Sequence, residues 1–283
     1  MKEWWAAFWQ LLFPQPSCCY ICKQPFRREY FRQVAHRETT GKGSLWEPYL
    51  HQLDVCLADA LCSACLDEIQ WITDSYCRTC GRAIDQPNDN LGRTYGILTL
   101  SGQESAVEQC RDCFGGSKRN FLHSRSAAVY DGTVREIIHQ FKYRGQRHMS
   151  ELLADVMLLA FARHYEPLAI DLLVPVPLHS ERLVERGFNQ SLYLCRSIAE
   201  KKHIPIADIL VRTHATHKQS KKAKWERTHS LVGAFQCMQE ERARGKRILL
   251  IDDIYTTGAT VDACAAVLYS VGATAVYVLT VAR

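Results

Sequence analysis

The chain has 283 residues, of which 47% are hydrophobic and 23% are charged. This balance excludes wholesale disorder, and the length predicts one core of ordinary size plus a smaller module. The net charge of +5 is compatible with anionic ligands but does not by itself indicate a nucleic-acid-binding protein.

The N-terminal stretch, residues 1–13, is rich in Trp and Leu. It is too short to span a bilayer and has no small-residue cleavage site. A helix that binds a membrane or a partner is the alternative, but basic residues do not line its polar face, so we favour packing on the protein's own body. We therefore expect an N-terminal helix on a cytoplasmic protein.

Eight of the thirteen cysteines form four Cys-x-x-Cys pairs. The odd total fits poorly with a secreted disulfide scaffold, whereas each such turn can offer two thiolates to one zinc ion. We expect two structural zinc sites with sequential pairing. Interleaved pairing, a redox dithiol, a ribbon without its ion, and Cys18 in place of Cys19 stay open. The expected metal ligands are Cys19, Cys22, Cys62, Cys65, Cys77, Cys80, Cys110 and Cys113.

Polar, glycine-containing stretches lie between the cysteine pairs, at 26–48 and 83–102, and predict loops or short hairpins. The composition changes at Gly115-Gly116-Ser117. We place the domain boundary there, with an N-terminal helix and a double zinc ribbon module in 1–116 and an α/β domain in 117–283.

Short apolar strands and helical patterns alternate from residue 127 onwards. Strands are expected at 128–130, 171–176, 247–252 and 275–281, and helices at 131–141, 151–165, 192–202 and 261–271. This alternation predicts a doubly wound, mostly parallel sheet.

The strand expected at 171–176 runs into two prolines, which remove the hydrogen-bond donors that an inner strand needs. The chain must turn there, and guanidinium and amide groups follow at once. A solvated helix start is the alternative, but we favour a pyrophosphate-binding loop. Its candidate residues are Pro175, Val176, Pro177, Arg182, Arg186, Asn189 and Gln190.

A basic segment with a single acid, Glu226, spans residues 212–228. Such a run is commonly a solvated loop, yet its position suggests a cover that closes over a polyanion or contacts single-stranded DNA. A further basic candidate lies at the end of the domain's first helix, with a snorkelling surface lysine as the alternative. The candidates for DNA contact are Lys142, Arg212, Lys218, Gln219, Lys221, Lys222, Lys224 and Arg227.

Two acids, Asp252 and Asp253, follow the apolar run 248–251 at the end of an expected strand, and a hydroxyl-rich glycine turn and a helix come next. Acids at the carboxyl end of a parallel strand and a turn at a helix N-terminus together predict a sugar-phosphate pocket. A capped helix without a ligand is the alternative, and an ATPase is excluded because no Gly-x-x-x-x-Gly-Lys-Ser/Thr loop occurs. The turn residues are Thr256, Thr257, Gly258, Ala259 and Thr260.

This stretch resembles the phosphoribosyl pyrophosphate (PRPP) signature of type I phosphoribosyltransferases. The resemblance implies that Asp252 and Asp253 are catalytic and hold the ribose hydroxyls, that the turn binds the 5-phosphate, and that Mg2+ accompanies the pyrophosphate. No residue identifies an acceptor or a dedicated base. Glutaminase chemistry is unsupported, since Lys2 and not a cysteine follows Met1.

Nearly the whole chain resembles the ComF family of competence proteins, which join a zinc ribbon module to a phosphoribosyltransferase-like domain. The resemblance rests on the cysteine pairs, on 141–145, 174–178, 186–190 and 233–235, on Gln219 with Arg227, and on the Asp252 signature. The chain departs from the family pattern in the basic segment: the family usually has an asparagine shortly after its arginine, whereas this chain has Ser230 there.

The ComF resemblance implies an accessory role in natural transformation, that is DNA uptake. The partners would be PRPP, single-stranded DNA, a competence helicase (ComFA-like) and a recombinase loader (DprA-like), in the cytoplasm or at the inner face of the membrane. The alternative is an active phosphoribosyltransferase, a pentosyltransferase that transfers phosphoribosyl to a base or nucleic-acid acceptor. The sequence leaves this choice open.

Overall fold

The computed structural model describes residues 17–26, 60–72, 76–84, 95–100, 103–114, 118–143, 149–213 and 233–283. The expected N-terminal helix, the boundary at 115–117 and most of the basic segment lie outside these residues, so the domain division stays a prediction.

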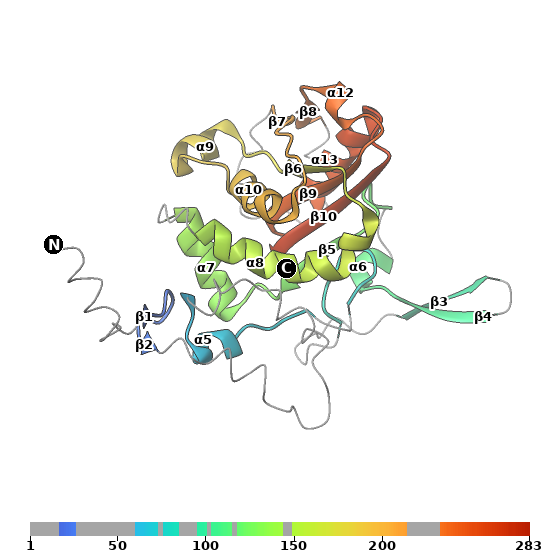
Figure 1. Cartoon of the computed structure of the whole chain (residues 1–283). Helices are drawn as coiled ribbons and strands as arrows, with labels where there is room; N and C mark the ends of the chain where they lie inside the picture. Colours follow the sequence, from blue (N-terminus) through green and yellow to red (C-terminus); the bar gives the residue numbers. More distant parts are fainter. Residues whose placement is uncertain are drawn as a thin grey trace.

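A four-stranded parallel sheet forms the centre of the molecule (Figure 1). Its strands are β5 (Ser124–Ala128), β6 (Leu172–Pro175), β9 (Arg247–Ile254) and β10 (Ala275–Ala282). Their order is β5-β10-β9-β6, so β9 and β10 lie inside and β5 and β6 at the edges. Pro175 is the last residue of β6, as its missing backbone donor requires.

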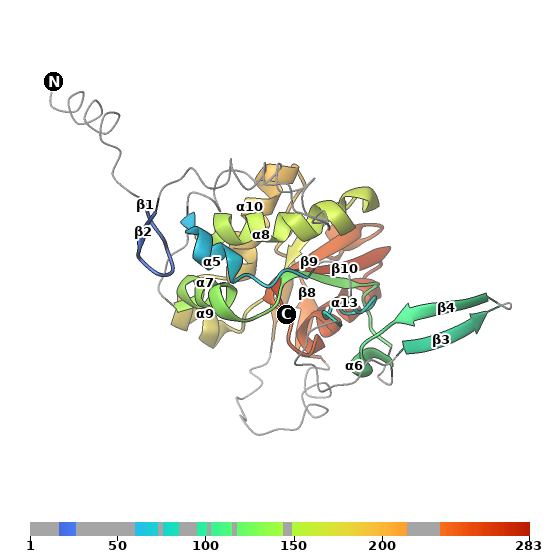
Figure 2. The same ribbon diagram turned by 90° about the horizontal axis from the view of Figure 1, so that it is seen from below.

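Helices cover both faces of this sheet (Figure 2). The longer ones are α7 (Gly132–Tyr143), α8 (Met149–His164), α10 (Gln190–Lys202) and α13 (Ala259–Ser270). Leu249 and Ile251 of β9 share a core with α7, α8 and α10, whereas Ile248 and Leu250 share a second core with α13. Because successive side chains of a strand point to opposite faces, β9 is apolar on both. The predicted doubly wound α/β fold is confirmed.

Shorter elements complete the described residues. They are β1 (Ser17–Cys18), β2 (Pro25–Phe26), α5 (Ser63–Asp67), β3 (Tyr95–Leu100), β4 (Gln103–Glu108), α6 (Arg111–Phe114), η1 (Glu166–Leu168), α9 (Ser180–Arg186), β7 (Leu210–Arg212), β8 (Phe235–Cys237) and α12 (Glu240–Ala243). Strands β3 and β4 form an antiparallel hairpin that projects from the body in both views (Figures 1 and 2). This hairpin includes the end of the stretch 83–102, where a loop or hairpin was expected.

One strand prediction was wrong in position. The first strand of the central sheet in chain order is β5 at 124–128, whereas a strand was expected at 128–130. The sequence pattern did not reveal this strand, because three of its five residues are polar and polar groups are buried only where they find hydrogen-bond partners. Ser126 Oγ hydrogen-bonds Thr280 Oγ1 of β10 at 2.6 Å, and Arg125 Nη1 donates to the carbonyl oxygen of Arg78 at 2.9 Å. These hydrogen bonds offset part of the cost of burying the polar groups of the segment Ser-Arg-Ser-Ala-Ala.

No described helix is both long enough and apolar enough to cross a bilayer.

Candidate functional site

Three segments that are distant in sequence meet at the acid pair near the carboxyl end of β9. Asp252 Oδ1 accepts a hydrogen bond from Ser191 Oγ at the start of α10, at 3.0 Å. Asp253 Oδ2 forms a salt bridge with Lys142 Nζ in the last turn of α7, at 2.8 Å. Both side chains of this ion pair are largely buried. The acids therefore lie in a prepared polar environment rather than on open surface.

Burial raises the pKa of Asp252 to about 7, and the negative charge of Asp253 acts in the same direction. The backbone N–H of Asp253, Lys142 and the Ser191 hydroxyl stabilise the charged form but do not offset the loss of water. At neutral pH such a carboxyl group is only partly ionised, and a cation or several hydrogen-bond donors that approach it favour the charged form. A sugar with adjacent hydroxyls, accompanied by a divalent cation, supplies both.

We expect the substitution Asp252→Asn to change how stability depends on pH. The carboxyl group holds its proton more tightly in the folded chain than in the unfolded chain, where its pKa is about 4. Folding stability is therefore lost as pH rises from about 4 to about 7. Urea unfolding at pH 5 and pH 7.5 should show that the variant gains stability relative to wild type at the higher pH. Asp67→Asn, at an exposed position of α5, is the control, and identical pH profiles for wild type and Asp252→Asn would contradict this expectation.

The turn that follows β9 presents backbone N–H groups at the start of α13. Gly258 precedes the helix with φ +80°, a conformation that favours glycine. A Cβ atom there would lie 2.0 Å from the hydroxyl oxygen of Tyr255, which is 2% exposed. The buried Tyr255 side chain thus packs directly against the turn and leaves no room for a side chain at position 258. Such a helix N-terminus suits a phosphate group.

The segment after β6 is held against β9 by hydrogen bonds of its own. The Val176 N–H donates to the Ile251 carbonyl oxygen at 3.0 Å, and Asn189 Nδ2 donates to the Val176 carbonyl oxygen at 3.2 Å. Asn189 Oδ1 also accepts from the Ser191 N–H and so caps α10. The side chain of Asn189 therefore fixes the loop and the Ser191 hydroxyl beside Asp252.

The other candidate side chains of this segment differ in their hydrogen-bond and ion-pair partners. Arg186 Nη1 donates to Gln190 Oε1 at 2.9 Å, and its guanidinium carbon lies 5.3 Å from the ring centroid of Tyr143. Gln190 Nε2 is buried and has no hydrogen-bond partner among the described residues. Arg182, by contrast, forms a salt bridge with Glu185 within α9, which sequence patterning did not reveal as a helix.

The structure places the candidates for DNA contact in different positions. Lys142 joins the acid pair, and Arg212 lies in β7 with its guanidinium carbon 5.6 Å from the ring centroid of Phe235. Burial lowers the pKa of Arg212. The remaining six candidates, Lys218, Gln219, Lys221, Lys222, Lys224 and Arg227, lie outside the described residues. Sequence reasoning missed Ser191, which a search for hydroxyls in the first turn of α10 would have found.

The eight paired cysteines form two groups of four, in the sequential order of the chain. One group is Cys19, Cys22, Cys62 and Cys65, and the other is Cys77, Cys80, Cys110 and Cys113, with the sulfur atoms of each group within 4.8 Å of one another. We call these groups the first and second tetrads. Cys18 is exposed and belongs to neither.

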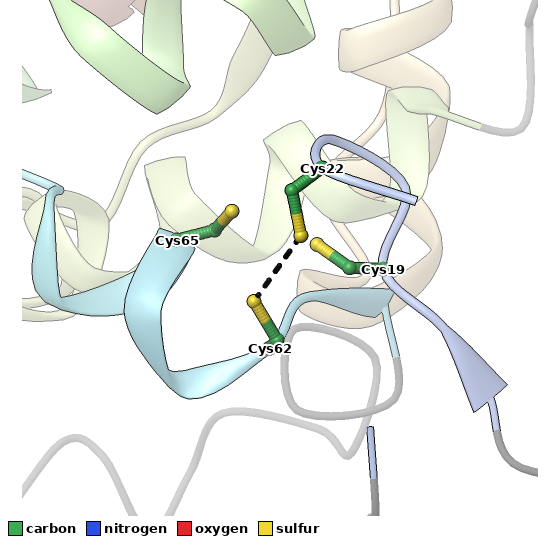
Figure 3. Close-up of side chains that lie close together, drawn as sticks. All are labelled: Cys19, Cys22, Cys62 and Cys65. Carbon is green, nitrogen blue, oxygen red and sulfur yellow. Dashed lines mark hydrogen bonds between the residues drawn. The ribbon is translucent and has the colours of Figure 1, made fainter. Parts of the chain in front are cut away.

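The sulfur geometry of the tetrads fits a tetrahedral metal. Figure 3 shows the four side chains of the first tetrad converging, with Cys22 Sγ and Cys62 Sγ 3.6 Å apart. The corresponding distance between Cys80 Sγ and Cys110 Sγ in the second is 3.5 Å. Four thiolates around a zinc ion at about 2.3 Å would be separated by about 3.8 Å. Both tetrads could therefore bind zinc.

The two tetrads are built by the same local structure. In the first, Cys19 N–H donates to the Gln24 carbonyl oxygen and Lys23 N–H donates back to Cys19; in the second, Cys77, Gly81 and Arg82 repeat this pattern. Lys23 and Gly81 both have positive φ, at 60° and 70°. The other two cysteines of each tetrad flank or lie within a short helix, α5 or α6. The described turns and short helices that carry the two tetrads thus repeat the same local structure.

Each tetrad belongs to the hydrophobic core on a different side of the central sheet. Cys19 and Cys65 belong to the core that contains α7 and α8, whereas Cys77, Cys80 and Cys110 belong to the core that contains α13. Residues 70–72 connect the two, and they run antiparallel to β5 through an isolated bridge between Trp71 and Ala128. The two tetrad regions are therefore parts of the two hydrophobic cores that flank the sheet.

A series of contacts joins the second tetrad to the turn at Gly258. Arg283 Nη1 donates to the Cys80 carbonyl oxygen at 2.7 Å, and its guanidinium carbon lies 4.3 Å from the ring centroid of Tyr255. Tyr255 in turn supports Gly258. The position of the tetrad and the shape of the turn therefore depend on each other.

Comparison with known proteins gives a consistent result. No protein-family model matches the chain. Competence protein ComFC of Bacillus subtilis (strain 168) is 32% identical over 222 residues, which cover 76% of this chain and 80% of that protein. DNA utilization protein YhgH of Escherichia coli (strain K12) is 33% identical over 162 residues, 56% of this chain and 70% of that protein.

Among solved structures, a hypoxanthine phosphoribosyltransferase from Staphylococcus aureus aligns with a TM-score of 0.30 and 15% identity, over 47% of this chain and 62% of that one. A TM-score this low carries no argument about function. The sequence relatives identify the family, because the match to ComFC covers most of both chains. The chain belongs to the ComF/ComFC family of competence proteins.

Proposed function

We propose that this protein binds PRPP together with Mg2+ at the acid pair and acts as an accessory protein in DNA uptake. The observation that carries the proposal is the meeting of Ser191 and Lys142 at Asp252 and Asp253, an acid pair that the chain follows with the turn into α13. Carboxylates for ribose hydroxyls and a helix N-terminus for a phosphate lie within one short segment of the chain. Membership of the competence family supports the biological setting.

The donor set around the acid pair fits Mg2+. This ion prefers oxygen ligands, usually one or two carboxylates together with substrate phosphates. Asp252 and Asp253 would provide the carboxylates, and the bound ion would neutralise charge on the pyrophosphate. The residues of the chain would bind and orient the ligand: residues 256–260 at the 5-phosphate, and the unpartnered Gln190 Nε2 on the pyrophosphate side.

A phosphoribosyl-transfer activity is the second candidate. One observation favours it: Asp252, with a pKa raised to about 7, can exchange a proton near neutral pH, as a general base must. Release of pyrophosphate on addition of a base or of single-stranded DNA would support transfer, whereas PRPP binding without release would favour a sensor.

The remaining parts of the proposal concern metals and partners. Zinc would occupy both tetrads and stabilise the ribbons without taking part in chemistry, since a four-thiolate site has no open position. Single-stranded DNA would contact the basic segment 212–228, and the ribbons or the β3–β4 hairpin would contact a competence helicase. YhgH is named a DNA utilization protein, which supports a DNA-related setting.

Calorimetric titration of the zinc-loaded chain with PRPP and Mg2+ tests the site. Asp252→Asn and Asp253→Asn should each weaken binding at least about tenfold, which corresponds to about 1.4 kcal/mol. Asp67→Asn is the matched control at an exposed acid. Undiminished binding in both site variants, or no binding to wild type, would contradict the proposal.

A further inference from the structure

A cavity of about 670 Å3 lies beside the second tetrad and α13, apart from the acid pair. Its wall includes Cys113, the segment 118–122 and Tyr269, and none of the residues assigned above to PRPP lines it. Ligand sites commonly have volumes of about 300 to 1,000 Å3. The cavity is therefore large enough for a ligand of its own.

The charge of this cavity selects an anion. Lys118 and Arg119 line it, and no carboxylate does. Arg119 Nη2 donates to the carbonyl oxygen of Thr257 at 3.1 Å, and no carboxylate of the described residues forms an ion pair with this guanidinium group. The nearby carboxylate of Asp262 is occupied by Asn120, whose backbone N–H and side-chain amide donate to its two oxygens at 2.7 and 3.1 Å.

The cavity also offers an apolar surface next to these cations. Leu122 is 56% exposed, although a large aliphatic side chain usually avoids water. The ring of Tyr269 is fixed, because its hydroxyl accepts a hydrogen bond from the Val276 N–H at 3.1 Å. A flat heterocycle could pack on these two side chains while its phosphate reaches Lys118.

We propose that this cavity binds a nucleotide, with its phosphate at Lys118 and Arg119 and its base against Leu122 and Tyr269. The cavity differs from the acid pair because it combines exposed apolar surface with two cations and has no carboxylate among its described lining residues, whereas the acid pair attracts cations and sugar hydroxyls. It is a second ligand site on the same domain.

The proposed nucleotide site is linked to the turn at Gly258, and this part of the inference rests on the proposed PRPP function. Arg119 bonds the Thr257 carbonyl, and Asn120 bonds Asp262 in the first turn of α13. A nucleotide that holds residues 118–120 in place therefore also holds the turn. Nucleotide binding would increase the affinity for PRPP, and by linkage PRPP would increase the affinity for the nucleotide by the same factor.

The test is calorimetric titration of the zinc-loaded full chain with AMP, in wild type and in four variants. Asp253→Asn disables the acid pair and should leave AMP affinity unchanged. Lys118→Glu reverses the charge in the cavity and should weaken AMP binding at least about tenfold, since each tenfold change is about 1.4 kcal/mol. Lys246→Glu, at an exposed lysine outside the cavity, should have no effect. Leu122→Ala should weaken AMP more than inorganic phosphate.

Several results would overturn the inference. They are AMP binding that Lys118→Glu leaves unchanged, AMP binding that Asp253→Asn abolishes, and the absence of AMP binding to wild type at millimolar concentration. Binding of an oligonucleotide without binding of AMP would overturn it as well, in favour of a nucleic-acid strand. If AMP binds through Lys118 while PRPP does not bind at all, the nucleotide site stands and the proposed PRPP function fails.

Discussion

Replacing Cys19 with serine is expected to remove one of two bound zinc ions and to lower the free energy of unfolding by several kcal/mol, whereas Cys18→Ser is expected to change neither. The two residues are neighbours, but Cys19 is buried in the first tetrad and Cys18 is exposed outside it. Structural zinc binding contributes about 10–16 kcal/mol in small zinc-dependent folds. Because whole domains are stable by only about 5–15 kcal/mol, a lost ion is a large fraction of stability.

The loss should extend beyond the ribbon, because Cys19 and Cys65 share a core with α7 and α8. Elemental analysis gives the zinc content per chain, and urea unfolding at pH 7 gives the free energy. The reverse pattern, with zinc lost in Cys18→Ser and retained in Cys19→Ser, would show that the first tetrad is wrongly composed. Two ions retained in both variants would show that the tetrad does not hold its metal through Cys19.

Replacing Gly258 with alanine is expected to weaken PRPP binding at least about tenfold, or about 1.4 kcal/mol. The new Cβ atom would lie 2.0 Å from the hydroxyl oxygen of Tyr255 and 2.3 Å from the ring carbon that bears it. The ring or the turn must move, and the positive φ adds about 1–2 kcal/mol of strain. Either movement displaces the N–H groups that would hold the 5-phosphate.

Gly245→Ala is the matched control for this substitution. Gly245 has φ +72°, and no atom lies within 4 Å of the position that its Cβ would take. Both variants should lose stability through backbone strain, measured by urea unfolding, but only Gly258→Ala should lose affinity for PRPP, measured by calorimetry. Equal PRPP affinities in the two variants would show that the turn does not contact the ligand.

Periodicity and spacing predicted most of the α/β fold, because its strands and helices carry strong local patterns. The strand at Ser124–Ala128 escaped, since its burial depends on partners elsewhere in the chain, such as Thr280. The spacing of the cysteines predicted metal turns, and the sequential grouping proved right because each tetrad joins two turns that are neighbours along the chain.

The acid pair was found from sequence, but its surroundings were only partly found. Lys142 was grouped with the basic segment because sequence shows a charge and not its partner. Only the fold brings the last turn of α7 to Asp253. Ser191 carries no motif of its own, and its role follows from the cap that Asn189 makes at the start of α10. Contacts between distant segments are not encoded in local pattern, which is why both roles were missed.

The arrangement of one tetrad on each face of the sheet limits how this protein can be divided or recombined. A fragment that begins after Cys113 would lack Leu61 and Cys110, which belong to the cores that contain α7 and α13, and would expose apolar surface there. Such surfaces promote aggregation. A chimera that carries the cysteine-rich third of a relative would fold only if that third fits both cores of this chain. A substitution in either tetrad region would therefore call for a compensating change in the core that this region shares with the sheet.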